Sequence, residues 1–278
     1  SGKAQMAYYH MLQRLNEVKL LKNKNEFISH MSSWVDSKDY NNLPVGMIIG
    51  MEGADSITDP DQLYEWYDEG LRLISLSHYG VSNYSHGTGT GTDGGLVGKG
   101  KELLIEMDKL NMILDVSHTS DESVRQELEI FEGPIIATHQ NCRSVAPGER
   151  QFPDHQLKSI IDRGGVIGHS MDTFMMWKTE IDWSDIPLPR PFPKDEVTLE
   201  DFVDHIDHVC QLSGNSLHSA IGGDTDGQGG MVGAPKEVDT VLDYQKIITL
   251  LQTRGYKDSD IENIFYKNWQ RFFEANLP

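Results

Sequence analysis

Residues 112–121 read MILDVSHTSD, and they contain in order the features that decide the fold. Met112 to Val116 form a short, mainly apolar run, which is typical of a strand buried on both faces of a parallel sheet. His118 follows shortly after this run. Thr119-Ser120-Asp121 is a typical helix start, because Ser, Thr and Asp side chains cap helix N-termini. The stretch therefore predicts a buried strand, a chemically capable side chain and a helix in succession.

The same succession recurs along the chain, and it predicts an α/β protein. Further apolar runs occupy Val45–Met51, Leu71–Leu76, Pro134–Ala137, Gly165–Gly168 and Ala220–Gly223. Helical patterns occupy Gly98–Leu110, Asp121–Phe131, Asp154–Arg163, Asp201–Leu212, Tyr244–Arg254 and, with no strand before it, Ala4–Lys22. The stretch WSDIPLPRPFPK over Trp183–Lys194 predicts an irregular surface loop, because it is rich in proline.

Polar side chains at the carboxyl ends of these runs favour a (β/α)8 TIM barrel of the metal-dependent hydrolase type. These residues are Glu52, His78, His118, His139, His169 and Asp224. Catalytic groups of such barrels lie just past the carboxyl ends of the strands, so the six side chains would share one face. No GxGxxG motif supports a dinucleotide-binding fold. We expect one domain over residues 1–278, an incomplete barrel with about six strand–helix units of the usual eight. The missing strands would precede the N-terminal helix.

Composition narrows the class of function. The chain has 278 residues with 38% hydrophobic and 24% charged content, as ordinary globular proteins do. Its net charge of -19 makes nucleic acids and anionic membrane surfaces poor partners. No apolar run is long enough for a membrane span, and no apolar segment of a signal peptide follows Ser1-Gly2-Lys3. Cys142 and Cys210 leave the compartment open: cytoplasmic, or exported with a targeting segment outside this chain.

Glu52, His118 and His139 are the strongest metal-ligand candidates. Imidazole and carboxylate together suit zinc and similar divalent ions. A carboxylate can also bridge two metals, which suits hydrolytic sites that activate water. A single histidine is more often a hydrogen-bonded structural residue, but three such groups at strand ends favour a metal site.

Two more residues are candidates for substrate chemistry. Asp224 lies in the glycine-rich sequence GGDTDG, where the backbone can approach a ligand and the acid can handle a proton, although a turn or a cation loop is the alternative. Arg150, on the loop after His139, can bind a substrate carboxylate through two hydrogen bonds, although alone it would be a surface arginine. His205 and His208 precede a strand on a predicted helix, and we expect them to be structural.

Seven motifs together resemble the membrane dipeptidase family of zinc metallopeptidases, the renal dipeptidase type. They are MEGAD with Glu52, SLSHYG with His78, ILDVSHTS with His118, IIATHQNCRSVAPGERQFPD with His139 and Arg150, DHIDHV, GGDTDG with Asp224, and the C-terminal NIFYKNWQRFFEANLP. The likeness runs from about Ala4 to the end, and the spacings from His118 to His139 and from His139 to Arg150 both fit. The joint pattern is specific, whereas each motif alone is weak.

The resemblance implies a (β/α)8 barrel with a two-zinc site that cleaves dipeptides, and in some members related amides, as a homodimer. By resemblance, Glu52 would bridge the metals, and His118 and His139 would bind the second one. His78 would contact the scissile carbonyl or the tetrahedral intermediate. Arg150 would bind the substrate's C-terminal carboxylate, and Asp224 its free amine or the proton in transfer. Under this reading His78 and Asp224 are the catalytic residues.

One departure from the family pattern concerns the first metal. The family has a His-x-Asp pair at the end of its first strand, and no such pair occurs before Glu52. The pattern therefore predicts zinc at one site, with Glu52, His118 and His139 as a three-ligand set, and leaves a second ion open. Two alternatives to dipeptide hydrolysis follow. In the first, the chain would be a degenerate barrel that binds a small carboxylate ligand without turnover. In the second, it would be an amidohydrolase that acts on a different amide.

Overall fold

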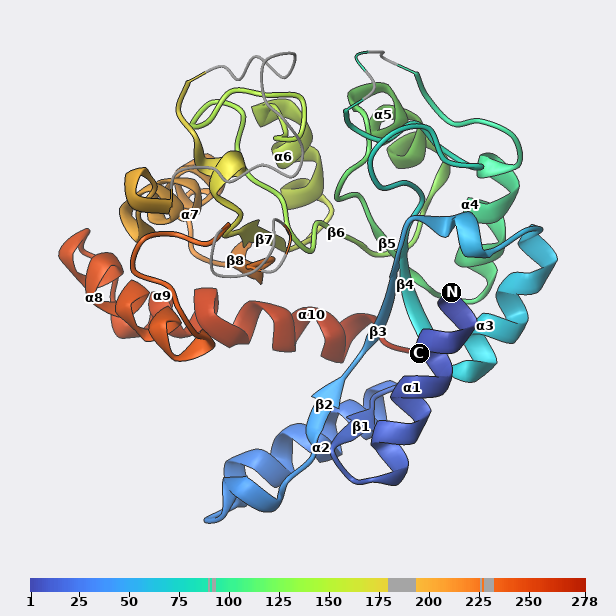
Figure 1. Cartoon of the computed structure of the whole chain (residues 1–278), viewed down its shortest axis with the longest axis horizontal. Coiled ribbons are helices and arrows are strands. Elements are labelled where there is room, and N and C mark those ends of the chain that lie inside the picture. Colours follow the sequence, from blue (N-terminus) through green and yellow to red (C-terminus); the bar gives the residue numbers. More distant parts are fainter. Residues whose placement is uncertain (90, 92–93, 180–193, 226, 228–232) are drawn as a thin grey trace. The chain divides into compact units, whose positions relative to one another are not determined.

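The computed structural model describes residues 1–89, 91, 94–179, 194–225, 227 and 233–278. They form two compact units (Figure 1). Unit 1 consists of Ser1–Pro134 together with Arg271–Pro278, and unit 2 consists of Ile135–Gln270. Both contain parallel strands and helices, which confirms the predicted α/β class. Within the described part of the chain, no helix is long and apolar enough to cross a membrane.

Unit 1 places three parallel strands side by side, in the order β3-β4-β5. The register sets Glu52 of β3 opposite Ser75 of β4, and Ile74 of β4 opposite Leu114 of β5. All residues of β4 and β5 are buried, as expected for a parallel sheet covered on both faces. The elements of the unit are α1 (Gly2–Arg14), β1 (Val18–Leu20), α2 (Lys24–Asp36), β2 (Val45–Met47), β3 (Ile49–Glu52), α3 (Leu63–Glu69), β4 (Leu71–Ser75), α4 (Gly100–Lys109), β5 (Ile113–Asp115) and α5 (Asp121–Ile130), with short 3-10 helices at Tyr40–Asn42, Ala54–Ser56 and Pro60–Gln62.

The first part of unit 1 differs from the prediction in two places. The helix expected over Ala4–Lys22 ends at Arg14, and β1 follows it. Asn16 adopts a left-handed backbone with φ of 62°, which Asn tolerates better than most residues and which ends the helix. The run Val45–Met51 is two strands with different partners, because β2 pairs with β1 whereas β3 pairs with β4.

Unit 2 has its own parallel pair, β7 and β8, with Gly168 opposite Ala220. Ala137, directly after β6, forms a parallel bridge to Ile167 of β7. A Cβ atom on Gly168 would lie 2.3 Å from the Thr138 carbonyl oxygen, so glycine is required for this close approach. The elements are β6 (Ile135–Ile136), α6 (Asp154–Asp162), β7 (Ile167–Ser170), α7 (Leu199–Ser213), β8 (Ser219–Gly223), α8 (Lys246–Thr253), α9 (Asp258–Glu262) and the start of α10 (Asn268–Asn276), with short 3-10 helices at Thr173–Met176, Lys194–Glu196 and Val241–Gln245 and a π-helical turn at Asn263–Lys267.

The long helix α7 organises the core of unit 2. Thr198 and Asp201 form a capping box at its start, and Gly214 ends it in the left-handed conformation. Phe202, Val203 and Ile206 of this helix are fully buried among apolar residues of α8 and α9. Of the loop predicted over Trp183–Lys194, all but Lys194 lies outside the described residues.

Candidate metal centre and active site

In unit 1 the predicted site residues stand at equivalent places on consecutive strands. Glu52 is the last residue of β3. His78 stands three positions after Ser75, where β4 ends, and His118 stands three positions after Asp115, where β5 ends. Because β3, β4 and β5 are parallel neighbours, these ends meet at one edge of the sheet.

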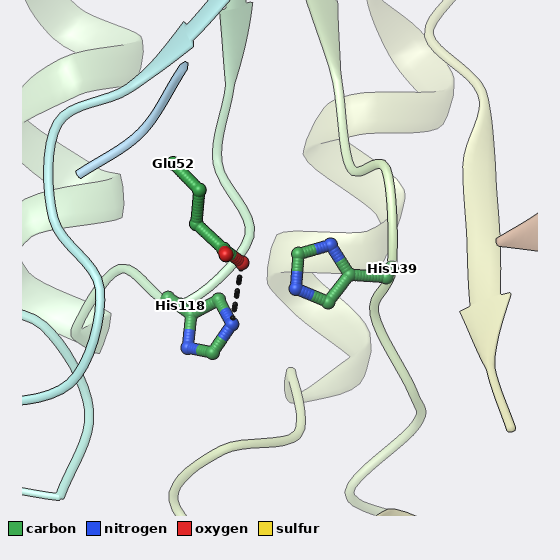
Figure 2. Close-up of side chains that lie close together, drawn as sticks. All are labelled: Glu52, His118 and His139. Atoms are coloured by element: carbon green, nitrogen blue, oxygen red, sulfur yellow. Dashed lines mark ion pairs between the residues drawn. The ribbon is translucent and has the colours of Figure 1, made fainter. Parts of the chain in front are cut away.

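The side chains of Glu52 and His118 form the centre of this edge. Glu52 Oε1 lies 3.0 Å from His118 Nε2, the ion pair drawn as a dashed line in Figure 2. His78 Nε2 lies 4.0 Å from Glu52 Oε2, and the His78 and His118 rings are 4.3 Å apart. The side chain of His118 is buried, whereas that of Glu52 is 48% exposed, so the carboxylate stays accessible to a ligand.

Local hydrogen bonds fix the His118 backbone. His118 has a φ of 66°, a conformation that a residue with a side chain adopts only when its surroundings impose it. Its carbonyl oxygen accepts a hydrogen bond from Thr88 N at 2.8 Å. Just before it, Ser117 N donates to Asp115 Oδ1 at 3.0 Å, and the Ser117 carbonyl accepts from Ser75 Oγ at 2.7 Å. The ends of β4 and β5 are thus tied together directly beside the imidazole.

His139 and Arg150 lie together in unit 2. His139 stands three positions after Ile136, where β6 ends, and its Nδ1 shares a hydrogen bond of 2.8 Å with Thr138 Oγ1. Arg150 donates from Nη2 to the His139 carbonyl at 2.9 Å and from Nη1 to Gln140 Oε1 at 2.5 Å. Arg150 is only 3% exposed, so the alternative considered for it, a surface arginine, is wrong. Its two hydrogen bonds to the residues after β6 draw the guanidinium inward.

Asp224 directly follows β8 and is held by a hydrogen bond. Its φ of 61° turns the chain sharply after the strand. Ser170 Oγ donates to Asp224 Oδ2 at 2.8 Å, which joins the ends of β7 and β8.

Asp172 is a further acidic residue near the strand ends of unit 2 that was not predicted from the sequence. It follows β7 closely and is only 2% exposed. Burial, together with the nearby Asp224 carboxylate, raises the pKa of Asp172 to about 8. The signal that points to it is an acid just past a buried strand, but the strand was predicted to end at Gly168 and His169 was taken as its end residue.

His169 is a structural residue and does not belong to the strand-end group. It lies inside β7 and is fully buried, with Nδ1 bonded to the Gln140 carbonyl at 3.1 Å and Nε2 to Ser219 Oγ at 3.0 Å. Burial lowers its pKa to about 3, so the ring is neutral. The strand extends beyond the predicted end, which turns this side chain into the core.

His205 and His208 on α7 also have structural surroundings. His205 is fully buried, and its Nδ1 accepts a hydrogen bond from Cys142 N at 3.1 Å. His208 Nε2 lies 2.8 Å from Asp154 Oδ1, so it joins α7 to α6.

The class of protein that this geometry indicates agrees with the comparisons with known proteins. A parallel α/β chain with carboxylate and imidazole groups at its strand ends has the features of a metal-dependent hydrolase class. The model of the family described as membrane dipeptidase (peptidase family M19) matches residues 2–276. The chain therefore belongs to this family of metallopeptidases.

Curated relatives are 26–30% identical to the chain over the aligned residues. Dipeptidase verJ of Clonostachys rogersoniana is 30% identical over 234 residues, which are 83% of this chain and 55% of the relative. Dipeptidase 3 of Mus musculus is 27% identical over 241 residues, 84% of this chain and 45% of the relative. The chain spans about half the length of the first curated relatives that it matches.

Solved structures show that the fold is shared. A metallopeptidase from Rhodobacter sphaeroides, solved with a phosphinate mimic of the dipeptide L-Ala-D-Ala, superimposes with a TM-score of 0.77 at 22% identity, covering 99% of this chain and 73% of its own. The probable dipeptidase PvdM from Pseudomonas aeruginosa gives a TM-score of 0.79 at 21% identity, covering 96% and 76%.

Proposed function

We propose that this chain hydrolyses dipeptides with a divalent metal ion, zinc, held by Glu52, His118 and His139. The observation that carries the proposal is the Glu52–His118 pair at the strand ends of unit 1 (Figure 2), together with the equivalent position of His139, three residues after β6 in unit 2. Family membership supports the reaction class.

The donor set fits the ion. One carboxylate and two imidazoles are ligands that zinc prefers, and three protein ligands with an open position are typical of catalytic zinc. A bound divalent ion would polarise the scissile carbonyl and make water a better nucleophile. A second ion stays open, because no His-x-Asp pair precedes Glu52.

The neighbouring side chains have distinct proposed tasks. His78, beside Glu52, donates a hydrogen bond to the oxyanion that develops on the scissile carbonyl. Asp224 binds the free amine or passes a proton to the leaving amine, since its carboxylate is oriented by Ser170 and remains partly exposed.

Arg150 recognises the C-terminal carboxylate of the substrate in this proposal. Its Nε is buried and, within the described part of the chain, has no hydrogen-bond partner. An unpaired N–H of a buried guanidinium is costly, and a carboxylate would satisfy it. A substrate carboxylate favours a dipeptide over an uncharged amide.

The wider architecture is also part of the proposal. We infer that residues 1–278 form a single incomplete (β/α) barrel domain, supported by the parallel strands of both units and by the likeness to family structures over nearly the whole chain. A homodimer is proposed on the family resemblance.

One alternative has a specific observation behind it. The buried Nε of Arg150, which has no hydrogen-bond partner within the described residues, also fits a chain that binds a carboxylate ligand without turnover. The Rhodobacter structure holds a mimic of L-Ala-D-Ala, so this dipeptide is the first substrate to test.

The test is hydrolysis of L-Ala-D-Ala by the whole chain with and without added zinc, measured as release of free alanine. The proposal expects zinc-dependent turnover that is lost in His118→Ala and kept in the exposed control His155→Ala. Dipeptide binding without turnover at any zinc concentration would overturn it in favour of the binding alternative.

A further inference from the structure

We propose that Asp172 is a positioning residue, which keeps the one proton of a carboxyl pair with Asp224 and so leaves Asp224 as the carboxylate that meets the substrate. The pair itself is a property of unit 2, and only its effect on turnover rests on the function proposed above. No part of the sequence analysis assigned a role to Asp172.

Gly227 shows that the two carboxyl groups are close. A Cβ atom on Gly227 would lie 2.7 Å from Asp224 Oδ1 and 2.9 Å from Asp172 Oδ2. Both oxygens therefore lie close to one point beside Gly227, and so close to each other. Two carboxylates close together repel each other, and protonation of one of them relieves the repulsion.

Ser170 links the same two residues by hydrogen bonds. Its hydroxyl accepts from Asp172 N at 3.1 Å and donates to Asp224 Oδ2 at 2.8 Å. Asp172 Oδ1 in turn accepts from Phe174 N at 3.3 Å. The segment after β7 therefore fixes both the Asp172 side chain and the hydroxyl that orients Asp224, so the pair has a defined geometry.

The environments of the two acids differ, and this assigns the proton. Asp172 is 2% exposed, whereas Asp224 is only partly buried. Burial raises the pKa of Asp172 to about 8, and the Asp224 charge contributes to this rise. Arg150 opposes it, and these two are the charged groups of the described residues that act on Asp172. At neutral pH the buried member carries the proton.

When the pH rises above the pKa of Asp172, its ionisation places a second negative charge beside Asp224. The added negative charge makes Asp224 hold a proton or an ammonium group more firmly. Its transfer or release is then slower, so turnover declines with rising pH. Asn at position 172 keeps the size and the acceptor for Phe174 N, but it cannot ionise.

The direct test needs no turnover. Carboxyl carbons of 13C-labelled aspartate are followed by NMR from pH 4 to 10 in the whole chain, and Asp172→Asn identifies the Asp172 signal by its loss. We expect one aspartate signal to titrate with a midpoint of about 8, and this midpoint to fall by about one unit or more in Asp224→Asn, since removal of a neighbouring charge stabilises the ionised form. The absence of any aspartate titrating above pH 6, or an unchanged midpoint in Asp224→Asn, would overturn the pair.

The activity test uses the pH profile of kcat/KM for L-Ala-D-Ala. Wild type should lose about tenfold per pH unit above its alkaline midpoint, as expected for one essential proton. The kcat/KM of Asp172→Asn should stay within about threefold of wild type at pH 7 and should lack the alkaline decline. A variant with a purely structural effect would keep this decline. Asp162→Asn, an exposed acid at the end of α6, is the matched control with a wild-type profile.

The two tests separate the claims. A titration near pH 8 in a chain without dipeptidase activity leaves the pair standing and rejects the proposed function. An active chain whose Asp172→Asn profile equals that of wild type rejects the role of Asp172.

Discussion

Glu52 Oε1 lies 3.0 Å from His118 Nε2, although their strands are not neighbours. β4 lies between β3 and β5 in the sheet, and both side chains reach across its end. Ser117 accepts a hydrogen bond from Ser75 and donates one to Asp115, and these two bonds fix the chain just before His118. The arrangement is therefore built into the strand ends before any ligand binds, as preorganised sites require.

Removing the Glu52 charge should abolish zinc binding. Glu52→Gln keeps the shape but replaces an anionic ligand by a weak neutral one, so we expect zinc affinity to fall by at least about 100-fold, the upper end of the effect of outer-shell changes. Competition with a chromophoric chelator measures the affinity. Glu65→Gln, on the exposed face of α3, is the control and should bind as wild type does. Equal affinities in both variants would remove Glu52 from the ligand set.

Ser75 should matter for stability. Its side chain is fully buried, and its hydroxyl lies within hydrogen-bond distance of the Ser77 and Ser117 carbonyls, to which it donates. Ser75→Ala leaves these buried oxygens without that donor, which costs about 1–3 kcal/mol. Urea unfolding measures the difference, and the exposed Ser56→Ala should stay within about 0.5 kcal/mol of wild type. No loss in Ser75→Ala would show that the strand ends are held by other contacts.

The sequence predicts which polar side chains follow a strand better than it predicts where each strand ends. His118 and His139 each stand three positions after a strand, and such positions can be recognised because a buried parallel strand is a continuous apolar run. Strand limits are harder to recognise. His169 was placed at a strand end because β7 was predicted to end two residues too early, and the same error hid Asp172.

Other features depend on contacts that no local pattern contains. The burial of Arg150 follows from hydrogen bonds to Gln140 and the His139 carbonyl, on a different part of the chain. β1 lies in a stretch with helical periodicity and forms because β2 pairs with it. Tertiary pairing decides such short strands, and propensity does not.

Arg150 should discriminate substrates by their carboxylate. Arg150→Lys removes the planar fork, so we expect KM for L-Ala-D-Ala to rise by about tenfold or more. The C-terminal amide of the same dipeptide should be hydrolysed poorly and equally by both proteins. Arg125→Lys, on the surface of α5, is the control. A similar rise in KM for dipeptide and amide would mean that Arg150 supports the loop and does not bind the carboxylate.

Acid should destabilise the chain through His169. Burial lowers the pKa of this imidazole to about 3, whereas in the unfolded chain it is 6.5. The unfolded state therefore binds a proton that the folded state rejects, and stability is lost as pH falls from 6.5 towards 3. The loss is about 1.4 kcal/mol per pH unit, or about 2 kcal/mol between pH 6.5 and 5.

Urea unfolding at pH 7 and pH 5 tests this. His169→Gln should show a smaller loss between the two values than wild type does, by about 2 kcal/mol. The exposed His155→Gln should behave as wild type. The same pH dependence in His169→Gln as in wild type would show that other groups cause the acid sensitivity.

The most direct measurement of the central claim is the zinc content per chain, determined by elemental analysis after saturation with zinc and removal of the excess. We expect one tightly bound zinc in wild type and almost none in His139→Ala, because Glu52, His118 and His139 are the proposed ligands. No bound zinc in wild type, or an unchanged content in His139→Ala, would contradict it.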